Sequence, residues 1–261
     1  MKDLFYLLFY LSSTVLSGQD QDWLSGRDSL FQNTNSKHFN IFYLEDVLSK
    51  SQLQDLVTSR EIAYDSIANF FQLTIDISTN IFLFPDEQIK QRITGHRGHG
   101  WAFENNIVEV FNDSIRVDPY HELVHRLGYS ISTPPALIDE GLAVYLSHKF
   151  AHKPFSKTLG FPENSINEIL HFLTKDKDLI EISTLYSIDE ISQANNAPLA
   201  YCQSASFVEY LITTYGKETF LELFTSFAKT SRGEYEQVFF QLYGKKIDQV
   251  ENQWIKYVGL N

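Results

Sequence analysis

Cysteine and methionine are almost absent from this 261-residue sequence. It contains one cysteine, Cys202, and one methionine, the initiator Met1. A single cysteine excludes an intramolecular disulfide framework, and it excludes zinc or iron–sulfur sites that are built on several thiolates. Any metal bound by this chain must therefore be held by histidine and carboxylate side chains.

Basic residues are also scarce, because 21 Lys and Arg stand against 33 Asp and Glu, which gives a net charge of −12. Nucleic acids and anionic membranes are bound through basic patches, so this balance argues against nucleic acid as a partner. Hydrophobic residues make up 43% of the chain, which is an ordinary globular composition. A peptide or protein therefore remains a possible partner, and nothing in the composition indicates the oligomeric state.

Long apolar runs are missing as well. Residues 4–11 form an apolar run that is too short to span a membrane, since a spanning helix needs about 20 residues. The run follows Lys2 and precedes small residues that end at Ser17 and Gly18, which is the order found in secretory signals. We expect residues 1–18 to be a signal peptide and the mature protein to be secreted or periplasmic, without stable membrane insertion. A buried N-terminal helix is the alternative.

The spacing of apolar residues predicts an α+β fold. We expect a small N-terminal mixed sheet-and-helix lobe over residues 19–115 and a mostly helical lobe over residues 116–261, which together form one compact unit. Residues 19–37 are polar and expected to be extended. Strands are expected at 39–44 and 80–84, helices at 46–71 and 86–92, and a hairpin of 101–103 with 107–111. Further helices are expected at 119–127, 135–149, 165–174, 199–215, 217–229, 234–243 and 247–258.

One short motif carries chemistry, the HExxH formed by residues 121–125. On a helix, His121 and His125 lie one turn apart on the same face, so both imidazoles can bind one metal ion. Glu122 is then placed beside the metal, where it can contact a water molecule without being a ligand. Asp118 is a suitable N-cap and Pro119 suits the first helical position. The alternative is a surface helix with two unrelated histidines.

A third ligand is required, and the metzincin solution is excluded. That pattern continues HExxHxxGxxH, but Ile131 stands at the position of the third histidine, and the mature chain has no methionine for a Met-turn. The segment 134–145, which runs Pro-Pro-Ala-Leu-Ile-Asp-Glu-Gly-Leu-Ala-Val-Tyr, supplies two acidic candidates, Asp139 and Glu140.

The HExxH followed by this segment resembles the gluzincin metallopeptidases, specifically the peptidase MA-like group related to thermolysin and the zinc aminopeptidases. The resemblance implies a zincin-like catalytic domain that holds one Zn²⁺ ion through His121, His125 and Glu140, with Glu122 as the general base of peptide hydrolysis. Asp139 would be the ligand in an aspzincin, but no Gly-Thr segment precedes it. Segments 200–216 and 247–257 extend the resemblance, which covers roughly residues 95–258.

Further roles follow from the same resemblance. Tyr201 is the candidate donor to the oxyanion, with a core tyrosine as the alternative. Strand 107–111 is expected to be an edge strand that binds the substrate as an additional strand, with a core strand of the small sheet as the alternative. Zinc aminopeptidases bind the substrate amine through the Glu of a Gly-x-Met-Glu-Asn segment, which Glu104 resembles, but Trp101 and Phe103 replace the Gly and Met and the gap to His121 is short. Glu104-Asn105-Asn106 is also a natural turn, so we favour the turn and an endopeptidase. The alternatives are an aminopeptidase-type or other amide hydrolase, and a catalytically weak zinc-binding scaffold.

His96 and His99 lie in a glycine-punctuated loop, residues 95–100. No carboxylate stands beside them in the sequence, so we interpret this segment as a loop that lines a groove rather than as a second metal site.

Overall fold

The computed structural model describes residues 23, 30–45, 48–96, 98–112, 115, 118–150, 165–175, 178–192, 194, 196–226 and 232–260. The chain divides into two compact units, Met1–Leu127 and Gly128–Asn261. The expected border near residue 115 stays a prediction, and the expected signal peptide, residues 1–18, lies outside the described residues. None of the helices within the described part combines the length and the apolar character that crossing a membrane requires.

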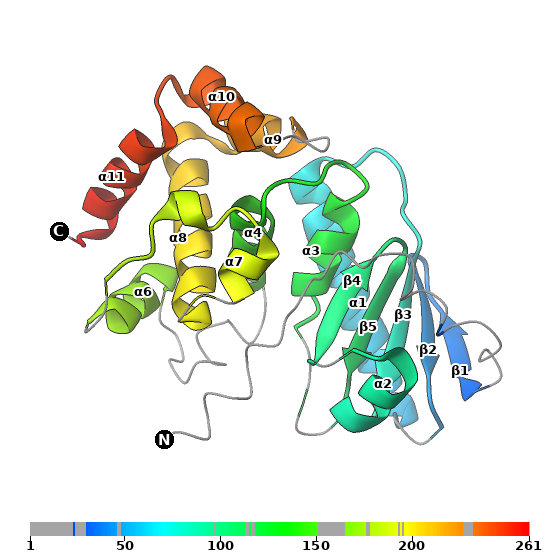
Figure 1. The fold of residues 1–261 in the computed structure, drawn as a ribbon. Coiled ribbons are helices and arrows are strands. Elements are labelled where there is room, and N and C mark those ends of the chain that lie inside the picture. The colour runs from blue at the N-terminus through cyan, green and yellow to red at the C-terminus, as the bar shows by residue number, and fades with distance from the viewer. Residues whose placement is uncertain are drawn as a thin grey trace. The chain divides into compact units, whose positions relative to one another are not determined.

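Five strands of the described part of the first unit form one sheet, in the order β1-β2-β3-β5-β4 (Figure 1). The strands β2, β3 and β5 are parallel, and the two outer strands are antiparallel to their neighbours. Their bounds are β1 Gln32–Asn35, β2 Phe39–Tyr43, β3 Thr79–Phe84, β4 Gly100–Phe103 and β5 Asn106–Val110. The expected strands and the hairpin are confirmed. β1 lies in the segment that we expected only to be extended. Its side chains are mostly exposed, so its sequence lacks the alternation of apolar and polar residues that predicts a strand.

The strand that we expected at the edge of the sheet is internal, so that prediction is wrong and the alternative of a core strand is confirmed. β5 pairs with β3 on one side and with β4 on the other. The turn at Glu104 and Asn105 folds β4 back onto the side of β5 that would otherwise be open, and all five residues of β5 are buried. Among the strands that the structure describes, β4 is therefore the edge strand on this side of the sheet.

Within the described residues, three helices cover the two faces of this sheet: α1 Lys50–Phe71, α2 Glu87–Thr94 and α3 His121–Gly128. Ile89 and Ile93 of α2 pack on the face that carries Phe82 and Trp101. The opposite face carries Glu109 of β5, which pairs with Arg60 of α1. Directly opposed residues of neighbouring strands point to the same face, so Gly100, the partner of Glu109, belongs to the face covered by α1.

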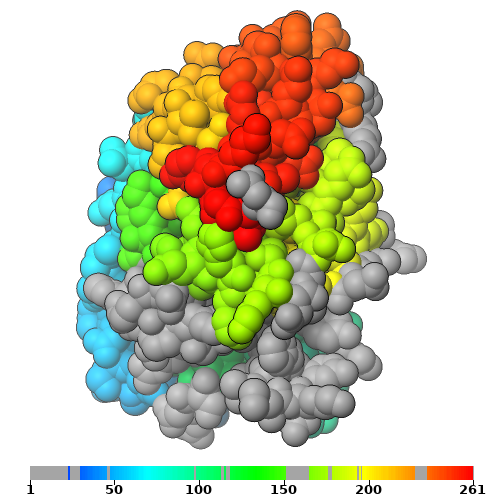
Figure 2. Space-filling model, turned by 90° about the vertical axis from the view of Figure 1, so that its left-hand side faces the viewer, coloured from blue at the N-terminus to red at the C-terminus, as the bar shows by residue number. Residues whose placement is uncertain are grey.

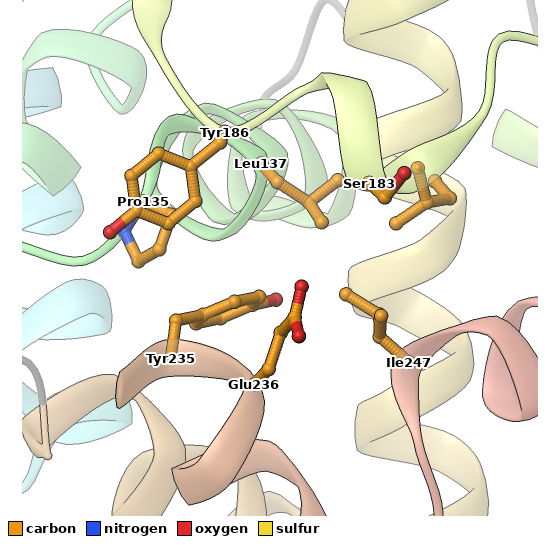
Figure 3. A pocket seen from close by; sticks show the side chains of 8 residues that line it. Pro135, Leu137, Ser183, Tyr186, Tyr235, Glu236 and Ile247 are labelled. Carbon is orange, nitrogen blue, oxygen red and sulfur yellow. The ribbon is translucent and has the colours of Figure 1, made fainter. Parts of the chain in front are cut away.

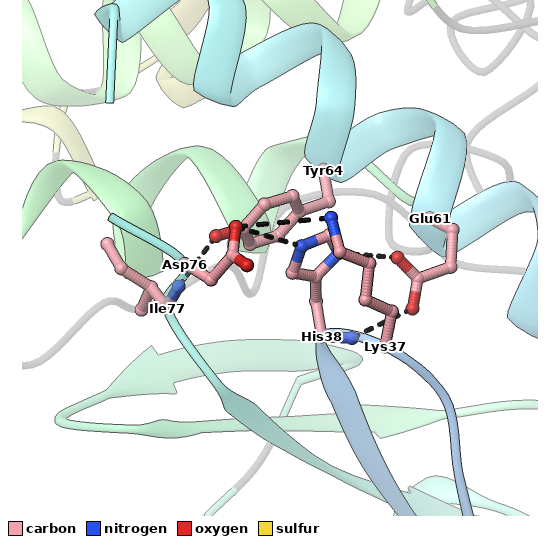
Figure 4. Close-up of polar contacts among 6 residues, drawn as sticks. All are labelled: Lys37, His38, Glu61, Tyr64, Asp76 and Ile77. Atoms are coloured by element: carbon pink, nitrogen blue, oxygen red, sulfur yellow. Dashed lines mark hydrogen bonds and ion pairs between the residues drawn. The ribbon is translucent and has the colours of Figure 1, made fainter. Parts of the chain in front are cut away.

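Helix α1 is fastened to the start of β2 by a polar cluster around His38 (Figure 4). The buried His38 ring stacks on Tyr64, with ring centroids 3.6 Å apart, and its Nδ1 lies 2.6 Å from Glu61 Oε2. The Tyr64 hydroxyl accepts a hydrogen bond from the Ile77 N–H just before β3. Burial acts to raise the pKa of Glu61, but hydrogen bonds with Ser36 and His38 outweigh it and hold this pKa below its usual range. These contacts fix the orientation of α1 over the sheet.

The described part of the second unit is helical. Its helices are α4 Ala136–Phe150, α6 Ile166–Thr174, η4 Ile182–Thr184, α7 Ile188–Ser192, α8 Ala197–Tyr215, α9 Lys217–Thr225, α10 Arg232–Tyr243 and α11 Ile247–Val258. The six longer helices expected in this region are confirmed. η4 and α7 were not expected, because three to five residues are too few to show a helical period.

Helix α8 forms the centre of this unit, since 12 of its 19 residues are buried. Ser206 of α8 accepts a hydrogen bond of 2.9 Å from the indole N–H of Trp254 in α11. Figure 2 shows α11 in red against α6 in yellow-green, and there the His171 imidazole N–H donates to the Val258 carbonyl. A small pocket lies among Pro135, Leu137, Ile182, Ser183, Tyr186, Tyr235, Glu236 and Ile247 (Figure 3).

Candidate metal centre

The helix that carries the HExxH motif begins at a polar cap. The Asp118 carboxylate accepts a 2.7 Å hydrogen bond from the Tyr120 N–H, as expected for an N-terminal capping residue. The Tyr120 carbonyl accepts the helical hydrogen bond of Val124. Both motif histidines are buried, with exposed fractions of 6% for His121 and 1% for His125. The alternative of a surface helix with two unrelated histidines therefore does not hold.

The two imidazoles are spaced as ligands of one metal ion. His121 Nε2 and His125 Nε2 lie 3.3 Å apart. Two nitrogens that bind zinc tetrahedrally at about 2.0–2.1 Å are separated by about 3.3–3.4 Å. The ring arrangement on α3 thus fits zinc without any movement of the helix.

Glu140 completes a group of possible ligands. It lies on α4, is 1% exposed, and its carboxylate oxygen and the two imidazole nitrogens all lie within 4.8 Å of one another. Among the described residues, no other set of three His, Cys, Asp or Glu side chains meets this criterion. Two imidazoles and one carboxylate are the donor set of catalytic zinc sites, so the residues present fit a zinc ion. Asp139, the alternative ligand, is buried but does not belong to the group.

Glu122 lies against the start of the edge strand β4. Its side chain is 2% exposed. A Cβ atom placed on Gly100 would lie 3.2 Å from Glu122 Oε1 and 3.4 Å from Glu109 Cγ. The backbone of β4 therefore passes close to the Glu122 carboxylate, and a side chain at position 100 would crowd that carboxylate.

Buried charges surround Glu122 on the sheet side. Burial raises the pKa of Glu109 to about 7, while the Arg60 guanidinium opposes that effect and the nearby Glu122 adds to it. Burial lowers the pKa of Lys90 to about 8, against the attraction of Glu87 and Glu122. The Lys90 ammonium lies 4.2 Å from the centroid of the Trp101 ring and donates to the His96 carbonyl.

Sequence reasoning did not identify Arg60, Lys90 or Glu109, because none of them belongs to a motif. Two of the three nevertheless carry a signal in their positions. Arg60 falls in the buried stripe of α1 between Leu56 and Tyr64, and Glu109 interrupts the apolar run of β5. A charged residue at a core position of an amphipathic helix or strand is rarely buried without a partner.

The remaining predicted residues lie as follows. Tyr201 is on α8 and buried, with 2% exposure, and its role as oxyanion donor stays a prediction. Glu104 is exposed in the β4–β5 turn with φ of 46°, so the turn interpretation is confirmed. The His96 ring lies 4.8 Å from Trp101, and the His99 carbonyl accepts from the Val110 N–H. Burial lowers the pKa of His99.

The family model of the Peptidase MA superfamily matches residues 119–259, which is more than half of the chain. The chain belongs to the Peptidase MA superfamily. The matched residues include all of the motif helix α3 and the helices of the second unit, and the gluzincin resemblance is confirmed. A comparison with curated proteins finds no match.

Several solved structures share the fold of this superfamily member. An M1 zinc metallopeptidase mutant of Deinococcus radiodurans, with a bound Tyr-Ser-Ala substrate, is 13% identical with a TM-score of 0.56, covering 88% of this chain and 51% of the other. Native yeast LTA4 hydrolase is 14% identical with a TM-score of 0.55, covering 87% and 38%. A functionally unknown Bacillus anthracis protein is 11% identical with a TM-score of 0.50, covering 89% and 52%.

At these identities the likeness shows the fold alone. This chain spans about half of the M1 peptidase and less of the hydrolase. The expected α+β fold, a mixed sheet followed by a mostly helical region, is confirmed.

Proposed function

We propose that this protein is a zinc-dependent metallopeptidase that binds one Zn²⁺ ion through His121, His125 and Glu140. The observation that carries the proposal is the convergence of these three side chains, with the buried Glu122 next to the first of them in the sequence. Membership of the Peptidase MA superfamily supports the same reaction class. A weak zinc-binding scaffold would have no use for a carboxylate at the position of the general base.

Each residue has a distinct chemical task in this proposal. Zinc, when bound, supplies Lewis acidity that lowers the pKa of a water molecule to about 7. Glu122 accepts the proton of the attacking water and passes it to the leaving amine. Glu140 supplies a negative charge that offsets the charge of the ion, while the imidazoles remain neutral ligands. Tyr201 is proposed to donate a hydrogen bond to the developing oxyanion.

The edge strand β4 is the proposed binding element for the substrate. A peptide can extend a sheet by hydrogen bonding along an open edge, and β4 is the outermost strand on this side of the sheet. Contact between Gly100 and Glu122 would bring a peptide bound along β4 close to the general base. This argument supports a peptide substrate, in agreement with the bound tripeptide of the Deinococcus enzyme.

Internal cleavage is favoured over aminopeptidase activity. The candidate amine-binding residue, Glu104, is exposed in the β4–β5 turn rather than buried beside Glu122. Digestion of a mixed peptide library, followed by mass spectrometry, distinguishes internal cleavage from trimming of N-termini. Substitution Glu104→Gln should leave the cleavage pattern unchanged. If Glu104 bound the substrate amine, the same substitution would abolish the trimming of N-termini.

The central test separates metal binding from hydrolysis. The wild-type protein should contain about one zinc ion per chain, and both His121→Ala and Glu140→Ala should reduce the zinc content strongly. Glu122→Gln should retain zinc and lose hydrolysis by about 10²- to 10⁴-fold. Full zinc content in His121→Ala would contradict the ligand assignment, and an active Glu122→Gln variant would contradict the assignment of the base.

Export is a separate proposal that rests on the sequence of residues 1–18. N-terminal sequencing of protein recovered from outside the cytoplasm should find a start at Gly18 or Gln19. A start at Met1 in an exported fraction would contradict cleavage of the signal.

A further inference from the structure

A buried arginine holds the chain just before the motif helix. Arg60 of α1 is 2% exposed. Its Nη1 donates a 3.1 Å hydrogen bond to the Pro119 carbonyl, and its Nη2 pairs with Oε2 of Glu109 on β5. The next residue after Pro119, Tyr120, provides the first carbonyl of the α3 hydrogen-bond ladder. Arg60 therefore connects the entrance of α3 to the C-terminal part of β5.

A second buried arginine holds the other end of the same helix. Arg126 follows the ligand His125 and is 5% exposed. Its Nη2 donates to the Ser78 carbonyl at 3.1 Å and to Asn105 Oδ1 at 2.7 Å. Ser78 directly precedes β3, and Asn105 directly precedes β5. Arg126 therefore connects the end of α3 to the N-terminal ends of two parallel strands.

The part of α3 that lies between the two arginine contacts and the part of β5 that lies between them have similar lengths. Residues 119–126 of a helix rise by about 10 Å, and residues 105–109 of a strand by about 13 Å. Arg60 and Arg126 thus attach the two ends of α3 to points near the two ends of β5, and α3 runs antiparallel to that strand. A helix held at both ends can neither slide nor rotate along the sheet without breaking one of the two connections.

We propose that Arg60 and Arg126 are positioning residues that clamp α3 to the sheet, so that Glu122 faces Gly100 at the start of the edge strand. The proposal rests on the proposed function in one respect, namely that the position of Glu122 matters for hydrolysis. Both arginines are buried, so they act through α3 rather than on a substrate.

The chemistry of the guanidinium group explains why both positions carry arginine. Its planar fork donates several hydrogen bonds in fixed directions, which lets each arginine reach two acceptors on different segments at once. Lysine retains the charge but concentrates it on one ammonium group at the end of a flexible chain. Arg60→Lys and Arg126→Lys should therefore keep the buried charge and lose the two-point connection. Arg92→Lys, at an exposed position of α2, is the matched control.

Hydrogen exchange of the full-length metal-free protein measures the clamp without relying on catalysis. We expect the amides of residues 120–128 to exchange at least 10-fold faster in Arg60→Lys and Arg126→Lys than in the wild type and in Arg92→Lys. Exchange in β3 and β5 should change much less. An equal increase throughout the unit would show a general loss of stability and would overturn the proposal, as would wild-type exchange in both variants.

Kinetics of the zinc-loaded protein give the second measurement. A small misplacement of Glu122 should lower kcat by about 10- to 100-fold and leave KM close to the wild-type value, because substrate binding along β4 is not disturbed. A rise in KM with unchanged kcat would overturn the positioning role. If the wild type hydrolyses no peptide, the proposed function fails, whereas the exchange result for α3 still decides on the clamp.

Two further variants protect the test against misfolding. Arg60→Met with Glu109→Gln removes both buried charges together, so no charge is left without its partner. Asn105→Ala removes only an exposed acceptor of Arg126, and it should increase exchange in the last turn of α3 alone. Wild-type exchange throughout α3 in both of these variants would overturn the proposal.

Discussion

The close packing of α4 against α8 makes Gly141 the position where a single methyl group should have the largest effect. A Cβ atom at Gly141 would lie 2.6 Å from the Ser204 carbonyl oxygen and 2.8 Å from Val208 Cγ2. The nearest atom belongs to the backbone of α8, so no side-chain rotation can relieve the overlap. Gly141→Ala must separate the two helices by about 0.8 Å to restore an ordinary contact of about 3.4 Å.

The size of the effect follows from two opposing contributions. Overfilling a packed core costs about 1–3 kcal/mol, and alanine favours a helix over glycine by about 1 kcal/mol. We expect a net loss of about 1–2 kcal/mol in the free energy of unfolding of the metal-free protein. Because Gly141 follows Glu140, the shift also moves the proposed zinc ligand by more than the roughly 0.2 Å that a metal site tolerates. Zinc affinity should fall by about 10- to 100-fold.

Urea denaturation and zinc competition with a chromogenic chelator measure the two effects separately. Val208→Ala in the Gly141→Ala background is the sharpest control. It removes the side-chain contact and leaves the contact with the Ser204 carbonyl, so it should restore neither stability nor zinc affinity. A Gly141→Ala protein with wild-type stability and wild-type zinc affinity would refute the argument.

Three further substitutions address the charges and the glycine around Glu122. Lys90→Met tests the lysine whose pKa is lowered to about 8 from a usual 10.5. Between pH 8 and 10.5 the Lys90 side chain is protonated in the unfolded chain but largely deprotonated in the folded protein, so raising the pH stabilises the folded wild type. In urea titrations, the free energy of unfolding of the wild type should therefore rise from pH 7.5 to 9.5 by about 2 kcal/mol more than that of Lys90→Met. Equal slopes of both proteins would contradict burial of this charge. Gly100→Ala should lower kcat by about 10-fold at unchanged zinc content, since its methyl group lies 3.2 Å from Glu122 Oε1, and unchanged kcat would show that the carboxylate has room to move. Arg60→Met should destabilise the protein by about 3–5 kcal/mol in thermal or urea unfolding by leaving Glu109 unpaired, and Arg60→Met with Glu109→Gln should recover most of this loss. No recovery in the double variant would contradict the pairing of the two charges.

The motif helix and most other elements were predictable because their signals are local. His121 and His125 are four residues apart, and the helical period alone places them on one face. Asp118 caps the same helix within a few residues of the motif. The helices of the second unit show the same kind of local apolar period, whereas β1 does not, because its side chains are mostly exposed.

The partners of the buried charges around α3 were not predictable, because each partner lies far away in the sequence. Arg60 and Glu109 are 49 residues apart, and Arg126 and Ser78 are 48 residues apart. A sequence places each of these residues on a helix or strand, but only packing decides whether its charge is buried and what it meets. The same holds for Gly141, whose need to be glycine comes from a carbonyl on a different helix.

The sequence by itself indicated the type of chemistry that we propose, because the HExxH spacing and the segment that contains Glu140 predict a donor set for zinc through local helical geometry and family resemblance. Only the tertiary structure decided which strand lies at the edge of the sheet. β4 and β5 are both short apolar strands of one hairpin, and their order depends on β3, which forms hydrogen bonds with β5 and leaves β4 outermost. Strand order is a property of backbone hydrogen bonds between distant segments, and no local pattern of side chains specifies it.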